Sequence, residues 1–426
     1  MKKIKLQDAV SIGIGGMVGG GIFAVLGLAV SIAKGGTPLA FLFAGLIALL
    51  TSYSYAKLSG TYPDRGGTVK FINQGFGRTV FSGSMNNLLW VSYIIMLSLY
   101  ASAFGSYAPN FLGLVDSKTD FHIYASFIVI LATVINYYSI KVVSRIESYA
   151  VIIKLVILFL FIIIGGYGLI GNANLEQLEI SNWESPMSLI AGGMVIFVAY
   201  EGFELIANAA PDIENPQRNI SRAYYIAVIF VIILYLIIAV VTVGSLPFKE
   251  IATAQDYVLA EAAKPMLGKL GFTVITVAAL ISTFSAINAS LYGGSRVSYE
   301  IAEDDELPSH FASKLWNQPI GLMVTTVSTL VLTNLLDLES ISTAGSVGFL
   351  LVFAIVNYAG VKLYKETGGK RVIHFIAFLL CSVALVILLI QELRSNILGV
   401  VVAVGIIVAC LIAEWVFQRW WGSNKL

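Results

Sequence analysis

Lys154 carries the clearest chemical implication in the sequence, because it is a cation inside the long apolar run ESYAVIIKLVILFLFIIIGG at 147–166. If this run is a helix that crosses a bilayer, Lys154 lies about eight residues from its start, or about 12 Å deep. Ionisable side chains at such depth usually mark ion or proton pathways. Since loss of hydration favours the neutral amine, we predict that Lys154 takes up and releases a coupling proton. The structural alternative is a lysine paired permanently to a carboxylate or to carbonyls.

Two carboxylates lie three residues apart in AYEGFE at 199–204, and the glycine between them weakens the helix locally. We expect Glu201 to face a bound ligand or a proton, with a hydrogen bond to the loosened backbone as the alternative. Two roles stay open for Glu204. It either hydrogen-bonds the loosened backbone, because buried polar groups require partners, or it takes part in proton coupling.

The segment GIGGMVGGGIF at 13–23 holds five glycines between Gly15 and Gly21. Each glycine costs about 1 kcal/mol relative to alanine in a helix interior, so we predict a break. Free amides where the helix resumes favour an anion, and carbonyls ending the preceding helical segment favour an ammonium. Such a pair of sites suits a zwitterionic α-amino acid. Close helix packing is the alternative, whereas a phosphate loop is disfavoured because no GK[ST] ending follows.

The elements that position these residues are long apolar runs. The sequence has 426 residues, of which 58% are hydrophobic and 12% charged, against roughly a quarter charged in soluble domains. Runs of about 20 apolar residues cross a bilayer as helices. We therefore predict an all-α integral membrane protein with about twelve transmembrane helices, near 9–32, 38–57, 81–113, 121–139, 146–169, 187–209, 219–245, 270–299, 319–336, 340–362, 372–391 and 396–417.

The basic residues predict the orientation, because Lys and Arg near span ends stay in the cytoplasm. With twelve spans, 19 of the 26 Lys and Arg residues fall on the side of the N-terminus and six on the other, and Lys154 lies within a span. We expect a multi-pass protein of the cell membrane with both termini cytoplasmic, in contact with the lipid bilayer.

The two glycine-marked spans open consecutive blocks of five spans, near 9–169 and 187–362. Blocks that start on opposite sides have inverted topology, and matched irregular helices in two inverted halves indicate a midplane transport site. The sequence thus predicts a transport core over residues 1–365. The remaining residues, 366–426, form two additional spans and a cytoplasmic tail.

Five motifs in this order resemble the amino acid–polyamine–organocation superfamily over about residues 5–365. They are GIGGMVGGGIF at 13–23, YPDRGGTVKFINQGFG at 62–77, AYEGFE at 199–204, ENPQRNISRA at 214–223 and AEDDELPSHF at 302–311. Within it, the chain most resembles prokaryotic proton-coupled amino acid transporters with a lysine in span five. The resemblance implies a five-plus-five inverted repeat with discontinuous spans one and six, and amino acid symport by alternating access.

The resemblance also implies the site residues. Those expected at the substrate are Gly16, Met17, Gly19, Gly20, Gly21, Ile22, Phe197, Val198, Ala199, Tyr200 and Glu201. Gly20 stands where relatives have serine, and Val198 where many have a bulky aromatic gate, for which Phe197 or Tyr200 can substitute. Lys154 would occupy the place of a sodium ion in sodium-coupled members. Its expected partners are the Gly15 carbonyl and the hydroxyls of Ser282 and Ser285, and Glu204 is a further candidate for proton coupling.

Other functions are less well supported. An intramembrane enzyme is disfavoured, since no HExxH or GxSxG motif occurs. A channel suits inverted broken helices poorly, whereas an exchanger or a sodium-coupled carrier of the same fold remains an alternative. We expect no cofactor, because Cys381 and Cys410 lie in apolar runs and indicate neither a disulfide nor a metal site. A net charge of +1 gives no indication of nucleic acid binding. The sequence sets neither the amino acids carried nor the oligomeric state.

Overall fold

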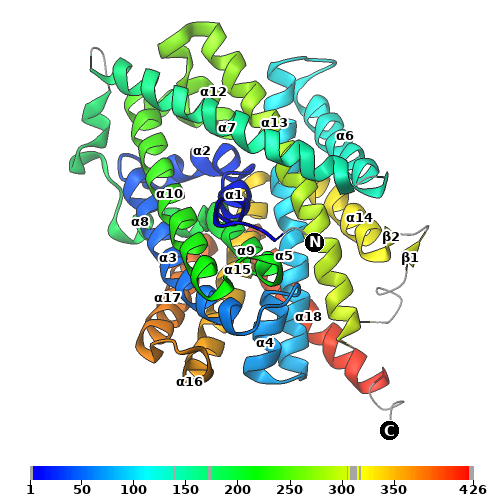
Figure 1. The fold of residues 1–426 in the computed structure, drawn as a ribbon. Helices are drawn as coiled ribbons and strands as arrows, with labels where there is room; N and C mark the ends of the chain where they lie inside the picture. Colours follow the sequence, from blue (N-terminus) through cyan, green and yellow to red (C-terminus); the bar gives the residue numbers. More distant parts are fainter. Residues whose placement is uncertain are drawn as a thin grey trace.

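The computed structural model describes residues 3–138, 140–170, 174–304, 306–307, 314–315 and 318–421, with the side chains of 140–148, 314–315, 318–319 and 421 excepted. Figure 1 shows a bundle of helices, with one hairpin of two-residue strands, Lys314–Leu315 and Gln318–Pro319, at its side. The predicted all-α membrane fold is therefore confirmed.

The long helices follow the predicted apolar runs closely. They are α3 (Thr37–Thr61), α5 (Val80–Tyr107), α6 (Ser117–Tyr138), α7 (Ile140–Leu169), α10 (Pro216–Ser245), α13 (Lys264–Glu303), α15 (Leu338–Lys362), α17 (Arg371–Ser395) and α18 (Ile397–Trp421). All nine are long and apolar enough to cross a membrane within the described residues. Proline lies at the first or second position of α3, α10 and α13, because the first turn of a helix needs no amide donor there.

Two further spans are bent pairs. Helices α1 (Leu6–Met17) and α2 (Gly21–Ala33) meet at 47°, and α8 (Pro186–Val195) meets the segment Phe197–Asp212 at 46°. Counting each pair once gives eleven candidate spans. The remaining predicted span, near 319–336, corresponds to α14 (Ile320–Leu335), an apolar helix of 16 residues, about 24 Å long.

Short helices make up the connections. They are α4 (Thr68–Phe76), η1 (Ala108–Asn110), η2 (Leu175–Leu178), η3 (Ile180–Asn182), η5 (Ala210–Asp212), α11 (Phe248–Thr253), η6 (Gln255–Tyr257), α12 (Val258–Ala262) and α16 (Tyr364–Thr367). The sixth span itself continues through η4 (Phe197–Glu204) and α9 (Leu205–Ala209).

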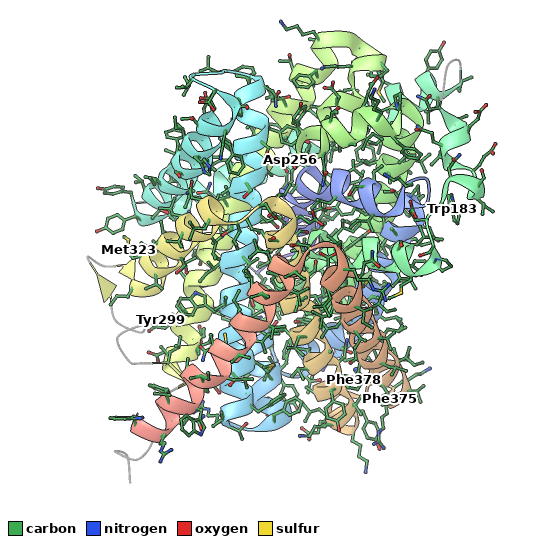
Figure 2. The ribbon with its side chains drawn as sticks, turned by 180° about the vertical axis from the view of Figure 1, so that it is seen from behind. Trp183, Asp256, Tyr299, Met323, Phe375 and Phe378 are labelled. Atoms are coloured by element: carbon green, nitrogen blue, oxygen red, sulfur yellow. The ribbon has the colours of Figure 1, made fainter. Side chains whose placement is uncertain are left out.

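Burial separates a centre from a periphery. The most apolar window of α5 is 94% buried within the protein, against 28% for α17 and for α18. Figure 1 places α1 near the middle of the bundle, where it packs against α10 and η4. The outer helices present apolar side chains outward, such as Phe375 on α17, which Figure 2 shows at the edge of the molecule. Such an apolar outer surface suits contact with lipid, so α17 and α18 lie at the boundary of the protein. The first bent pair lies in its interior, where α1 packs against α10 and η4.

Candidate functional site

The first break lies where the glycine run predicts it, between α1 and α2. Val18, Gly19 and Gly20 separate the two helices, and Gly20 is the N-cap of α2. The first backbone hydrogen bond of α2 runs from the Ala24 amide to the Gly20 carbonyl, at 3.0 Å. The amides of Gly21, Ile22 and Phe23 precede it and so have no partner within the helix. Free amides at the start of a helix, with the helix dipole behind them, favour an anion.

Side chains of three other helices hold the carbonyls of this break. The Tyr235 hydroxyl of α10 donates to the Met17 carbonyl at 2.6 Å, and the Ser282 hydroxyl of α13 donates to the Gly19 carbonyl at 2.6 Å. The Lys154 ammonium of α7 donates to the Gly15 carbonyl at 3.0 Å. The carbonyls of the break are thus held by two hydroxyl donors, which a ligand can replace, and by one ammonium donor, whose strength depends on its protonation.

The second break is longer than Gly202 alone indicates. The α-helix ends at Val195, and residues Phe197–Glu204 form a 3₁₀ helix, η4. Ser342 and Ser346 of α15 both donate to the Val195 carbonyl at 2.8 Å. The Ser346 hydroxyl also accepts from the Val198 amide at 3.2 Å. Serines of α15 therefore support the backbone of the second break at Val195 and Val198.

The two breaks touch through backbone atoms. A Cβ added at Gly202 would lie 2.2 Å from the carbonyl carbon of Gly16, and one at Gly21 would lie 2.9 Å from the Cα of Ala199. No other residue type fits such an approach without moving the backbone. The Tyr235 hydroxyl also donates to the Ala199 carbonyl, at 3.3 Å, and so bridges both breaks. The predicted substrate residues of spans one and six are thereby brought together.

Lys154 is completely buried. Its bond to Gly15 places the ammonium beside the last turn of α1, so the lysine contacts the helix that ends at the break. Of the two serines predicted to face it, Ser282 donates to the carbonyls of Gly19 and Val18. Ser285 lines a cavity that also contains Gly15 and Glu201.

That cavity lies between span one and helices α5 and α13. Tyr93 and Tyr100 of α5, Glu201 and Ser285 line it, and its volume is about 10 Å³, which is room for about one water molecule. Glu201 is 3% exposed, and its Oε2 has no hydrogen-bond partner among the described residues. In this conformation the cavity has no room for a ligand larger than about one water molecule.

Glu204 faces a different set of groups. Its Oε2 accepts from the Thr68 hydroxyl of α4 at 3.0 Å and from the Tyr55 hydroxyl of α3 at 3.4 Å. These bonds come from side-chain hydroxyls of α3 and α4, not from the loosened backbone that the structural role names, and they fasten the second break to both helices. They leave the alternative role in proton coupling as a prediction.

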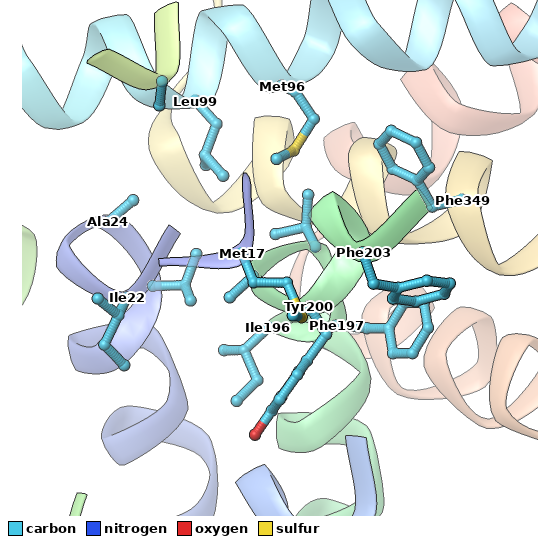
Figure 3. Close-up of a cluster of buried hydrophobic side chains, with 14 of the residues drawn as sticks. Met17, Ile22, Ala24, Met96, Leu99, Ile196, Phe197, Tyr200, Phe203 and Phe349 are labelled. Atoms are coloured by element: carbon cyan, nitrogen blue, oxygen red, sulfur yellow. The ribbon is translucent and has the colours of Figure 1, made fainter. Parts of the chain in front are cut away.

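Phe197 and Tyr200, the residues predicted to substitute for an aromatic gate, pack against neighbouring helices. The ring centroid of Phe197 lies 5.9 Å from that of Phe353 of α15, and Figure 3 shows Phe197 to one side of Met17 and Ile22. Tyr200 donates its hydroxyl to the Phe41 carbonyl of α3 at 3.0 Å. Val198 meets α15, where a Cβ at Gly345 would lie 3.2 Å from its side chain. The ring of Tyr100 of α5 lies at the first break, 2.4 Å from a Cβ built on Gly20.

Sequence reasoning missed Tyr100, Tyr235, Ser342 and Ser346. The signal for the serines was present in SISTAGSVG at 340–348, where small and hydroxylated residues repeat in a span, because hydroxyls hydrogen-bond across helices in membranes. The tyrosines carry no comparable local pattern.

The comparisons with known proteins agree with this geometry. A family model described as amino acid permease matches residues 4–415. An uncharacterized protein of Methanocaldococcus jannaschii is 33% identical, over 99% of this chain and 98% of its own. The inner membrane transport protein YbaT of Escherichia coli is 31% identical, over 98% and 97%. The branched-chain amino acid permease BcaP of Bacillus subtilis is 24% identical, over 84% and 80%. The chain therefore belongs to the amino acid permease family of the amino acid–polyamine–organocation superfamily, and it is a multi-pass membrane transporter rather than an enzyme.

Proposed function

We propose that this transporter carries α-amino acids into the cell by proton symport, with Lys154 as the carrier of the coupling proton. The observation that supports this most is the 3.0 Å bond from the buried Lys154 ammonium to the Gly15 carbonyl, in the helix that ends at the first break. One bond thereby links a titratable group to the backbone of the substrate site.

The substrate is bound through its zwitterionic end. Its carboxylate accepts from the amides of Gly19, Gly20, Gly21 and Ile22 at the start of α2, where the helix dipole adds to the attraction. Its ammonium donates to carbonyls of both breaks, at Gly16 and Met17 and at Phe197 and Ala199. Because the Tyr235 hydroxyl donates to Met17 and Ala199 in the closed site, the arriving ammonium takes over bonds that Tyr235 makes.

Coupling follows from the charge of Lys154. The protonated lysine holds α1 through the Gly15 carbonyl, with Ser282 and Ser285 on the facing helix, and the neutral amine is a weaker donor that releases it. A proton that crosses with the membrane potential supplies about 2.3 kcal/mol per 100 mV. At about 1.4 kcal/mol per decade, this supports roughly fifty-fold accumulation.

Glu201 lines the pocket and adjusts the preference between cationic and neutral side chains. The core is an inverted repeat of residues 9–169 and 187–362, with α17 and α18 outside it. Both termini lie in the cytoplasm of a cell whose plasma membrane holds the protein.

Transport by purified protein in liposomes tests the function. In a counterflow assay, labelled amino acid outside should enter liposomes that are loaded with unlabelled amino acid. Competition with the common amino acids should identify the substrates. Counterflow is the property of a carrier, so flux without counterflow would contradict the proposal and favour a channel.

A further inference from the structure

A cavity of about 420 Å³ lies away from the breaks, between α5 and α18 and beside Leu307. Figure 2 shows α18 crossing α5 on the face seen from behind, and the two helices are in contact. Trp90 and Val91 of α5 and Ala413 and Phe417 of α18 give the cavity apolar walls. It is far larger than the closed site at the breaks and separate from it.

Three buried polar side chains interrupt these walls, namely Asn87, Glu306 and Glu414. They are 7%, 2% and 1% exposed. Asn87 donates to Glu414 at 3.1 Å, and Asn86 donates to Glu306 at 2.5 Å. Glu306 Oε1 and Asn87 Oδ1 have no hydrogen-bond partner among the described residues. Both of these atoms are acceptors, so the cavity presents sites for a donor.

The cavity also lacks a compensating charge of its own. None of the described residues that line it is Lys or Arg, and none of the ion pairs found among the described residues includes Glu306 or Glu414. Burial and the neighbouring Glu414 raise the pKa of Glu306 to about 7, although the bond from Asn86 lowers it. Buried carboxylates are stabilised by a proton or by a paired cation.

The depth of the cavity, measured along α5 and α18 from the helix ends, indicates the source of such a cation. Asn87 lies seven residues into α5, and Glu414 lies seven residues before the end of α18. At 1.5 Å per residue both are about 10 Å from the helix ends, which is the boundary between headgroups and acyl chains. Exposed Trp415 and Trp420 occupy the same end of α18, as interfacial tryptophans do.

We propose that this cavity binds the ammonium headgroup of a membrane aminophospholipid, phosphatidylethanolamine. The ammonium donates to Glu306, Glu414 and Asn87, and the apolar walls accept the adjoining chain. The lipid phosphate stays outside, at an end of the two helices that carries the exposed Arg78 before α5 and the exposed Arg419 in the last turn of α18. Phosphatidylcholine does not fit, because its quaternary ammonium has no N–H to donate to the two acceptors without partners.

Native mass spectrometry of the full-length protein, reconstituted with defined lipids, tests the proposal. The wild type should retain one phosphatidylethanolamine in preference to phosphatidylcholine. The double variant Glu306→Gln/Glu414→Gln should lose at least about tenfold in this retention, because bonds to charged groups contribute about 1.5–3 kcal/mol each. Ala413→Leu, which fills the cavity without changing charge, should lose it also. Glu303→Gln removes an exposed carboxylate and serves as the control.

Equal retention of the two lipids by the wild type would overturn the proposal, as would unchanged retention by the double variant. Either result would mean that the carboxyls are neutralised by protons. A further arm uses dodecylamine, a soluble amphipathic amine. Retention of dodecylamine without retention of phosphatidylethanolamine would show a site for free amines and would equally overturn the lipid assignment. Thermal unfolding of each variant establishes that it is folded.

Discussion

Replacing Gly202 by alanine tests whether the two breaks lie in backbone contact. The new Cβ would lie 2.2 Å from the Gly16 carbonyl carbon and 2.5 Å from the Met17 amide, where ordinary contacts are 3.4–4 Å. Backbone atoms cannot rotate away, so one break must move by roughly 1 Å. Overpacking of this kind costs about 1–3 kcal/mol. Since the proposed carbonyl ligands of the ammonium lie on both breaks, the displacement should abolish substrate binding as well.

The assay is thermal unfolding of the purified protein with and without a transported amino acid. Gly202→Ala should unfold several degrees lower than wild type and gain no protection from the substrate. Gly405→Ala is the matched control, because a Cβ there meets nothing within 4 Å. The control should be neutral or up to about 1 kcal/mol more stable, since alanine favours a helix. Wild-type stability and substrate protection in Gly202→Ala would refute the contact between the breaks.

Three further predictions concern separate parts of the molecule. Gly19→Leu should abolish substrate binding with expression retained, because its Cβ already lies 2.9 Å from Ala286, and binding assays check this. Glu201→Gln should change the ranking of cationic against neutral substrates in competition assays, and an unchanged ranking with an unchanged pH profile would make Glu201 structural. For Glu306, a folded-state pKa of about 7 against an ordinary 4.5 means that its contribution to stability is complete below pH 4.5 and lost as pH rises through 7. In phosphatidylcholine, the unfolding temperature of Glu306→Gln should therefore fall less between pH 5 and pH 8 than that of wild type. Parallel curves of unfolding temperature against pH would contradict this.

The spans and the first break follow from local properties of the sequence. Bilayer-length apolar runs determine where helices form, and the predicted starts and ends fall within a few residues of most observed bounds. Five glycines in one short segment are sufficient to break a helix, and α1 ends at Met17 within that segment. The Gly15 partner of Lys154 came from the family resemblance, and the structure shows that bond.

The second break and its supports depend on contacts that no local pattern encodes. Its 3₁₀ stretch is held by Ser342 and Ser346, which lie about 150 residues further along the chain. Tyr235 reaches both breaks only because α10 packs against α1. The bond from Ser282 to the Gly19 carbonyl was not predicted, because that carbonyl is left open only where the break meets α13. Tertiary geometry therefore decided which of the predicted polar groups meet.

The central claim is that Lys154 carries the coupling proton, and uptake into liposomes under imposed gradients tests it most directly. Wild type and Lys154→Ala are reconstituted side by side, and accumulation of a transported amino acid is followed under a proton gradient and, separately, under a sodium gradient. The wild type should accumulate substrate with protons and not require sodium. Lys154→Ala should lose accumulation but keep part of its substrate binding or downhill exchange, because the backbone ligands of both breaks remain. Sodium-dependent uptake by the wild type, or undiminished proton-driven accumulation by Lys154→Ala, would contradict the claim and make Lys154 a structural cation.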